Sequence, residues 1–72
     1  MLSPIEEAIL LKAAQRAPQA TVSFHDLGDW QEVARALSSL ELEGLLERDF
    51  AGYRIMEQGA LVAALLQARA NA

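Results

Sequence analysis

The 72-residue sequence contains no cysteine and only one histidine. Without cysteine the chain can form neither a disulfide framework nor a thiolate metal site. A single imidazole among scattered carboxylates supplies too few ligands for a typical metal centre, so we expect no metal ion and no other cofactor. Stability must then come from side-chain packing, to which a second copy of so small a domain can contribute.

Long apolar runs are also missing. The longest uncharged apolar run is ALVAALL at residues 60–66, whereas a membrane span needs about 20 residues. Glu6 and Glu7 stand where a secretory signal would be apolar. The sequence therefore predicts a cytoplasmic protein without membrane contact.

Basic residues are few: six lysines and arginines stand against ten acids, for a net charge of −4. This balance disfavours generic attraction to nucleic acid or anionic lipid. The hydrophobic fraction of 53% excludes a disordered chain. No linker, repeat or low-complexity tract divides the sequence, so residues 1–72 are expected to form a single domain.

The first half of the chain shows two helix starts. Ser3, Pro4 and Glu6 form a capping-box pattern, and Pro18 is a stop, which together predict a helix over 3–17. The β-branched run in ATVSF predicts a short strand over 20–24. The S-x-x-D pattern that follows predicts a very short helix over 24–28, and Gly28 should end it.

The second half is more regular. Asp29 and Glu32 form a third cap pair, and Gly44 is the expected C′ residue of a helix over 30–43. Its core side at 100° per residue consists of Trp30, Val33, Ala34, Leu37 and Leu40. We expect Trp30 to be a core anchor; the alternative is a partly exposed ring at a partner surface.

A hairpin and a last helix complete the pattern. LLERDFAGYRIM predicts two short strands near 46–56, with a turn around Ala51 and Gly52. EQGALVAALLQARANA predicts a helix over 57–70. The expected fold class is therefore mostly α with a small β-hairpin.

The segments VARALSSLELEGLLERD and YRIMEQG carry a family resemblance. They fit the pattern V-x-R-x-L-x-x-L-E-x-x-G-L-[IV]-x-R followed by Y-x-[LI]-T-x-x-G, with Met56 in the threonine place. The matching residues are Val33, Arg35, Leu37, Leu40, Glu41, Gly44, Leu45, Leu46, Arg48, Tyr53, Ile55 and Gly59. Over roughly residues 3–70 the chain resembles the winged helix-turn-helix domains of transcription regulators. The resemblance implies a recognition helix over 30–43 and a wing formed by the hairpin.

The chain departs from this family in two ways. Between Val22 and Val33 it is about three residues shorter than the common pattern, close to one helical turn. The outward face of the helix over 30–43 also lacks the usual bases. The expected contact residues for nucleic acid or a protein partner are Gln31, Arg35, Ser38, Ser39, Leu42, Arg48 and Arg54.

Nothing in the sequence predicts an enzyme. Ser23, His25 and Asp26 are too close in the chain to converge easily in a catalytic triad. The acidic pairs have no spacing that implies general acid and base catalysis. We expect no catalytic residues.

The last helix predicts a partner surface. Its apolar residues form two adjacent stripes, more than one small core needs, and many winged-helix proteins dimerise through terminal helices. The expected homodimer interface consists of Leu61, Val62, Leu65 and Leu66, assisted by Leu10 or Leu11.

Two functional interpretations follow. The first is a small dimeric DNA-binding transcription regulator, favoured by the resemblance. The second is a winged helix that binds a basic protein partner through its acidic helix. Net charge, the shortened turn and Leu42 favour this alternative.

Overall fold

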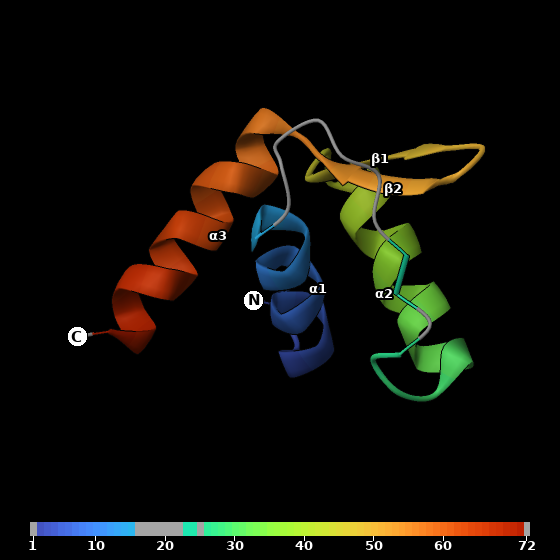
Figure 1. Cartoon of the computed structure of the whole chain (residues 1–72), viewed down its shortest axis with the longest axis horizontal. Helices are drawn as coiled ribbons and strands as arrows, with labels where there is room; N and C mark the ends of the chain where they lie inside the picture. The colour runs from blue at the N-terminus through green and yellow to red at the C-terminus, as the bar shows by residue number, and fades with distance from the viewer. Residues whose placement is uncertain (1, 16–22, 25, 72) are drawn as a thin grey trace.

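The computed structural model describes residues 2–15, 23–24 and 26–71. Its elements are α1 (Pro4–Gln15), α2 (Trp30–Leu42), β1 (Leu46–Asp49), β2 (Gly52–Ile55) and α3 (Glu57–Ala70). The two strands form an antiparallel hairpin. In Figure 1, α1 lies between α3 and α2, and the hairpin lies at one end of α2. The prediction of a mostly α fold with a small β-hairpin is confirmed.

The predicted capping box at the start of α1 is confirmed. The Ser3 backbone N–H donates to Glu6 Oε1 at 2.8 Å, and the Glu6 N–H donates to Ser3 Oγ at 3.3 Å. These reciprocal bonds satisfy two backbone donors that a helix end otherwise leaves without partners. The last two residues of the predicted helix, 16 and 17, lie outside the described residues.

The connection between α1 and α2 differs from the prediction. Residues 20–22 of the expected strand, and His25, lie outside the described residues. Ser23 and Phe24 are not in a strand, and no described residue of 24–28 is helical. Instead, the Leu27 N–H donates to the Phe24 carbonyl at 3.4 Å, and Gly28 has φ +138°. Nucleating the first turn of a helix costs free energy, and so short a segment adds too few further hydrogen bonds to offset that cost. The prediction of a short helix over 24–28 was therefore wrong.

The end of α2 follows the prediction and its start does not. Gly44 has φ +78°, its N–H donates to the Glu41 carbonyl, and the Leu45 N–H donates to the Leu40 carbonyl. This is the Schellman arrangement expected of a glycine at C′. At the other end, the Asp29 side chain makes no capping hydrogen bond within the described residues. The predicted third cap pair is therefore wrong.

One face of α2 forms the largest part of the core. Its buried residues are Val33, Ala36, Leu37 and Leu40. Trp30 was expected to anchor this stripe but is 50% exposed, because it occupies the first turn, beyond the packed part of the helix. Ala34 is only half-buried, whereas Ala36 is buried. The buried stripe is therefore rotated slightly from the predicted one, toward the side that faces α1.

The core joins all three helices and the hairpin. Its members are Ile9, Leu10, Ala13, Phe24, Val33, Ala36, Leu37, Leu40, Leu45, Leu46 and Ala63. Leu10 was predicted in a dimer interface, but its exposure is 0%. A side chain without accessible surface cannot contact a second chain, so that assignment is corrected. No buried polar side chain occurs in the described part of this core.

The hairpin and α3 are joined by close backbone contacts. Asp49 Oδ1 accepts the N–H groups of Ala51 at 2.8 Å and Gly52 at 3.0 Å, which closes the turn. A Cβ at Gly59 would lie 2.1 Å from the Leu45 carbonyl oxygen. Glycine therefore lets the first turn of α3 sit directly on the chain that enters β1. None of the helices in the described ranges is long and apolar enough to cross a bilayer.

Candidate functional site

The outward face of α2 borders an open polar hollow next to the start of α1. Its volume is about 270 Å³, and it is lined by Ser3, Glu6, Glu32, Arg35, Ala36 and Ser39. Of the predicted contact residues, Arg35 and Ser39 lie here. The structure thus brings two carboxylates, one guanidinium and two hydroxyls together on the surface predicted to read a partner.

The Glu6 carboxylate is held in its charged form. The hydrogen bond from the Ser3 backbone N–H lowers the pKa of Glu6, against an opposing effect of partial burial. Arg35 is exposed and makes no ion pair within the described residues. With Glu32, the hollow therefore holds two acidic side chains and one basic side chain.

Leu42 stands at the end of the same face. Its exposure is 89%, the highest of the leucines on α2. Glu41 and Glu43 flank it in the chain and are also exposed. Gln31 and Ser38, two other predicted contact residues, are exposed as well. The end of this face therefore combines one exposed apolar side chain with exposed carboxylates.

The two predicted bases of the hairpin lie on opposite faces. In the strand register Arg54 is opposite Glu47, and Arg48 is opposite Tyr53. Directly opposed residues share a face, and successive residues alternate between faces. Arg54 also forms an ion pair with Glu47, with its Nε 3.0 Å from Glu47 Oε1. Arg48 and Arg54 therefore cannot both belong to one basic strip with Arg35.

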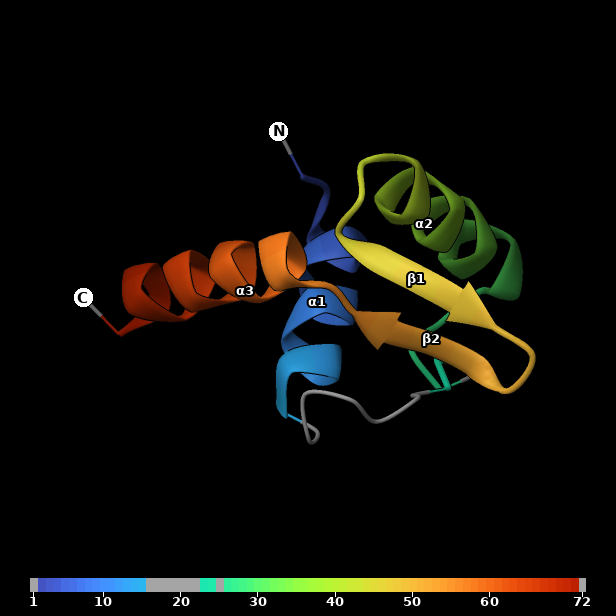
Figure 2. The same cartoon turned by 90° about the horizontal axis from the view of Figure 1, so that it is seen from above.

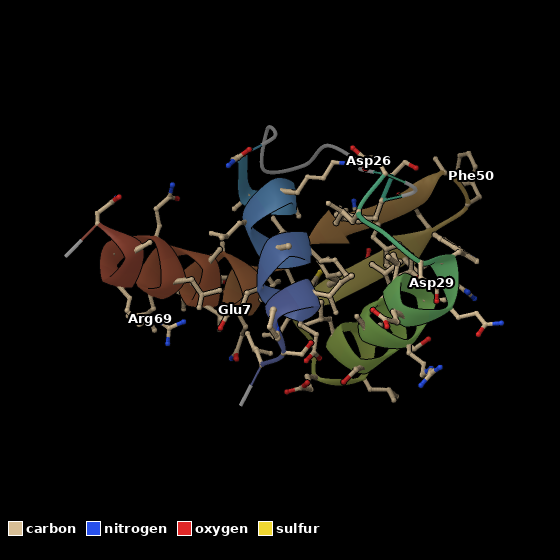
Figure 3. The ribbon with its side chains drawn as sticks, turned by 90° about the horizontal axis from the view of Figure 1, so that it is seen from below. Glu7, Asp26, Asp29, Phe50 and Arg69 are labelled. Atoms are coloured by element: carbon tan, nitrogen blue, oxygen red, sulfur yellow. The ribbon has the colours of Figure 1, made fainter. Side chains whose placement is uncertain are left out.

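All four aromatic residues gather near the tip of the hairpin. Phe24, Trp30 and Tyr53 line a hollow of about 80 Å³ together with Ser23, Leu37, Ala51 and Gly52. The rings of Phe24 and Tyr53 have centroids 6.4 Å apart. Figure 3 shows Phe50 at the hairpin tip, at the end of the molecule where Asp29 precedes α2. Sequence reasoning missed this grouping, because its members come from three separate segments.

The predicted dimer residues meet at the opposite end of the molecule. Val62, Leu65 and Leu66 line an apolar hollow of about 460 Å³ with Leu2, Glu7 and Arg69. Leu61 is exposed on α3, and Leu11 of α1 is half-buried. Leu2 was not predicted, because only the fold brings the start of the chain to α3.

The described residues contain no group of three or more His, Asp or Glu side chains that could hold a metal ion. Comparison of the chain with models of protein families, with curated proteins and with solved structures finds no match.

Proposed function

We propose that this chain is a winged-helix type domain that acts as a protein-interaction module, with the acidic outward face of α2 docking on a basic protein partner. The observation that carries the proposal is the placement of the bases. Arg54 is engaged by Glu47, and Arg48 lies on the other face of the hairpin. Arg35 shares its hollow with Glu6 and Glu32.

This placement is unfavourable for a nucleic-acid backbone. Binding to DNA depends largely on lysine and arginine side chains that neutralise phosphates. A phosphate in the hollow beside Arg35 would also meet the carboxylates of Glu6 and Glu32. A partner that carries lysines or arginines would meet the same carboxylates with attraction.

Leu42 supplies the apolar part of the proposed contact. Burying a leucine side chain in an interface contributes about 1.5–3 kcal/mol of transfer free energy. The surrounding carboxylates would contribute mainly to association rate and choice of partner. This combination predicts a partner surface with an apolar pocket surrounded by basic residues.

A pair of measurements tests the proposal. Mixed-sequence duplex DNA titrated at about 50 mM salt, where charge attraction is only lightly screened, should not bind. Partners captured from a cell extract by the wild-type chain should be lost with Leu42→Asp and with Glu43→Lys. Gln67→Lys, an exposed change on α3, is the matched control and should retain them. Duplex binding that Arg35→Ala weakens would overturn the proposal.

DNA binding is the second candidate, and one observation favours it. Arg35 is exposed on the outward face of α2, without an ion pair in the described residues, at the place where the resembling family contacts bases. In a dimer, Arg35 and Arg48 would each occur twice. Four phosphate contacts would give a slope of log affinity against log salt of about −3.6, at about 0.9 per contact. Arg35→Ala should then remove sequence preference at a cost of about 1–3 kcal/mol.

We further propose a cytoplasmic, non-catalytic homodimer that assembles through α3. The apolar hollow between Leu2 and the α3 residues Val62, Leu65 and Leu66 supports this assembly. Sedimentation across a concentration series tests the dimer, and cell fractionation tests the location. A strict monomer at high concentration would contradict the dimer and leave the proposal about α2 standing.

A further inference from the structure

The outer side of α3 presents a continuous apolar stripe. Leu61, Ala64, Leu65 and Ala68 follow one another at helical spacing i, i+3, i+4, i+7 and are all exposed. We call these four residues the α3 seam. Leu61 is 62% exposed and Leu65 is 71% exposed, although both are large and apolar. Figure 2 shows α3 extending away from the hairpin and α2.

The apolar hollow described above borders the seam at Leu65. It extends across Val62 and Leu66 to Leu2 at the start of the chain. At its rim Arg69 Nη2 donates to Glu7 Oε2 at 3.1 Å, and Figure 3 shows both residues on this side of the molecule. The rim thus carries one positive and one negative charge, whereas the floor is apolar.

The distribution of charge indicates what can cover this surface. Between Glu57 and Arg69 no residue of α3 is charged. The excess negative charge lies in residues 29–49, which contain six acids and two arginines. Two copies of the chain that met through α2 would repel each other. The seam and its rim are neutral in sum, so a second copy meets no such repulsion there.

We propose that a second copy of this chain covers the α3 seam, and that the two α3 helices pack antiparallel. The inference rests on the homodimer of the proposed function and specifies its geometry. A parallel pair would bring Glu57 close to its own equivalent, and likewise Arg69. An antiparallel pair brings Glu57 of one copy opposite Arg69 of the other and opposes the two helix dipoles.

The same register pairs the exposed leucines. When Glu57 lies opposite Arg69 of the second copy, Leu61 lies opposite Leu65, because both pairs are centred on Ala63. Each contact then occurs twice, as two-fold symmetry requires. The hollow next to Leu65 is placed to receive apolar side chains of the second copy. Charge and apolar surface thus select one register.

The first experiment measures association of the chain alone by sedimentation equilibrium. We expect Leu65→Lys to weaken dimerisation at least tenfold, because it places a charge in the centre of the seam. Phe50→Lys, at an even more exposed apolar side chain at the hairpin turn, is the matched control and should leave the dimer unchanged. A dimer that Leu65→Lys leaves intact would overturn the inference. Neither DNA nor a protein partner is present, so this outcome is separate from the test of α2.

The second experiment determines the direction of the helices, using the absence of native cysteine. In the proposed register Gln58 lies opposite Ala68 of the second copy, whereas the two Ala68 residues lie about 15 Å apart along the seam. A disulfide requires Cα atoms within about 7 Å. A mixture of Gln58→Cys and Ala68→Cys chains should therefore cross-link, and Ala68→Cys alone should not. Efficient cross-linking of Ala68→Cys alone would show a parallel pair and overturn the proposal.

Discussion

The helices α2 and α3 differ by one residue in length, 13 against 14, yet they pack in opposite ways. The helix α2 buries a row of large side chains that includes Val33, Leu37 and Leu40. The helix α3 buries only Gly59 and Ala63, and leaves Leu61 and Leu65 exposed. Both are rich in apolar residues, so composition alone does not explain the difference.

The difference comes from how closely each backbone approaches its neighbours. Gly59 allows the first turn of α3 to contact the Leu45 carbonyl directly, with no side chain between them. The small residues Gly59 and Ala63 of α3 therefore lie in the core, Val62 and Leu66 are only partly buried against it, and Leu61 and Leu65 face outward. In α2 the large side chains themselves fill the space between helices. Apolar residues on a helix are thus buried or exposed according to which side of the helix makes the closest backbone contact.

The largest expected effect is a difference in stability between substitutions of leucines in α2 and in α3. Leu37→Ala and Leu40→Ala should each reduce the free energy of unfolding by about 2–5 kcal/mol, because both leave cavities in the core. Leu61→Ala and Leu65→Ala should change it by about 0.5 kcal/mol or less in the monomer, as exposed substitutions usually do. Chemical denaturation at low protein concentration measures all four. Equal losses from the two helices would refute the comparison.

A change at Gly59 should come next in size. Gly59→Ala places a methyl group where 2.1 Å separates it from the Leu45 oxygen, so the backbone of α3 or β1 must move. We expect a loss of about 1–3 kcal/mol, the usual cost of overpacking. Thermal or chemical unfolding checks it, with the exposed Gln58→Ala as control. A stabilised Gly59→Ala variant, as helix propensity alone would predict, would show that close approach does not orient α3.

A smaller effect is expected in the hairpin that connects the two helices. Glu47 and Arg54 are directly opposed and ion-paired, with side chains 43% and 39% exposed. Exposed pairs of this kind contribute about 0.2–1 kcal/mol. A double-mutant cycle with Glu47→Ala and Arg54→Ala measures the coupling. A coupling energy of zero would make Arg54 available to a partner and so weaken the case against DNA binding.

The smallest effect concerns pH and the surface of α2. The pKa of Glu6 is lowered in the folded chain by the Ser3 backbone N–H. The folded state then binds this proton less readily than the unfolded state. Its contribution to stability is present above the unfolded pKa and is lost as pH falls through the folded pKa. The difference in unfolding free energy between wild type and Glu6→Gln should shrink in acid; a difference independent of pH would contradict this account.

Sequence reasoning succeeded where a few neighbouring residues decide the structure. The capping box of Ser3 and Glu6, the C′ glycine at Gly44 and the hairpin turn before Gly52 all depend on contacts within five positions. The burial of Leu37 and Leu40 followed from helical periodicity. The candidate site was predicted in part: Arg35, Ser39 and Leu42 lie on the expected surface of α2.

The predictions that were wrong depended on contacts between distant segments or on segments too short to form an element. Its angle on the helix predicted Trp30 in the core, but the buried residues of α2 begin only at Val33, and Trp30 in the first turn is half exposed. Leu10 was placed at an interface by its apolar character, but the fold buries it completely. The short helix over 24–28 had cap residues but too few positions to propagate.

The order of α1, α2, the hairpin and α3, the C-terminal end of α2 and the excess of acid in residues 29–49 all follow from the sequence alone, because caps, turns and periodicity operate over a few residues. Only the tertiary structure decided which apolar side chains are exposed and which bases have partners. Gly59 meets the Leu45 carbonyl, and Glu7 pairs with Arg69 across 62 positions of the chain. Such contacts depend on how distant segments pack, since burial and pairing depend on neighbours in space rather than in sequence.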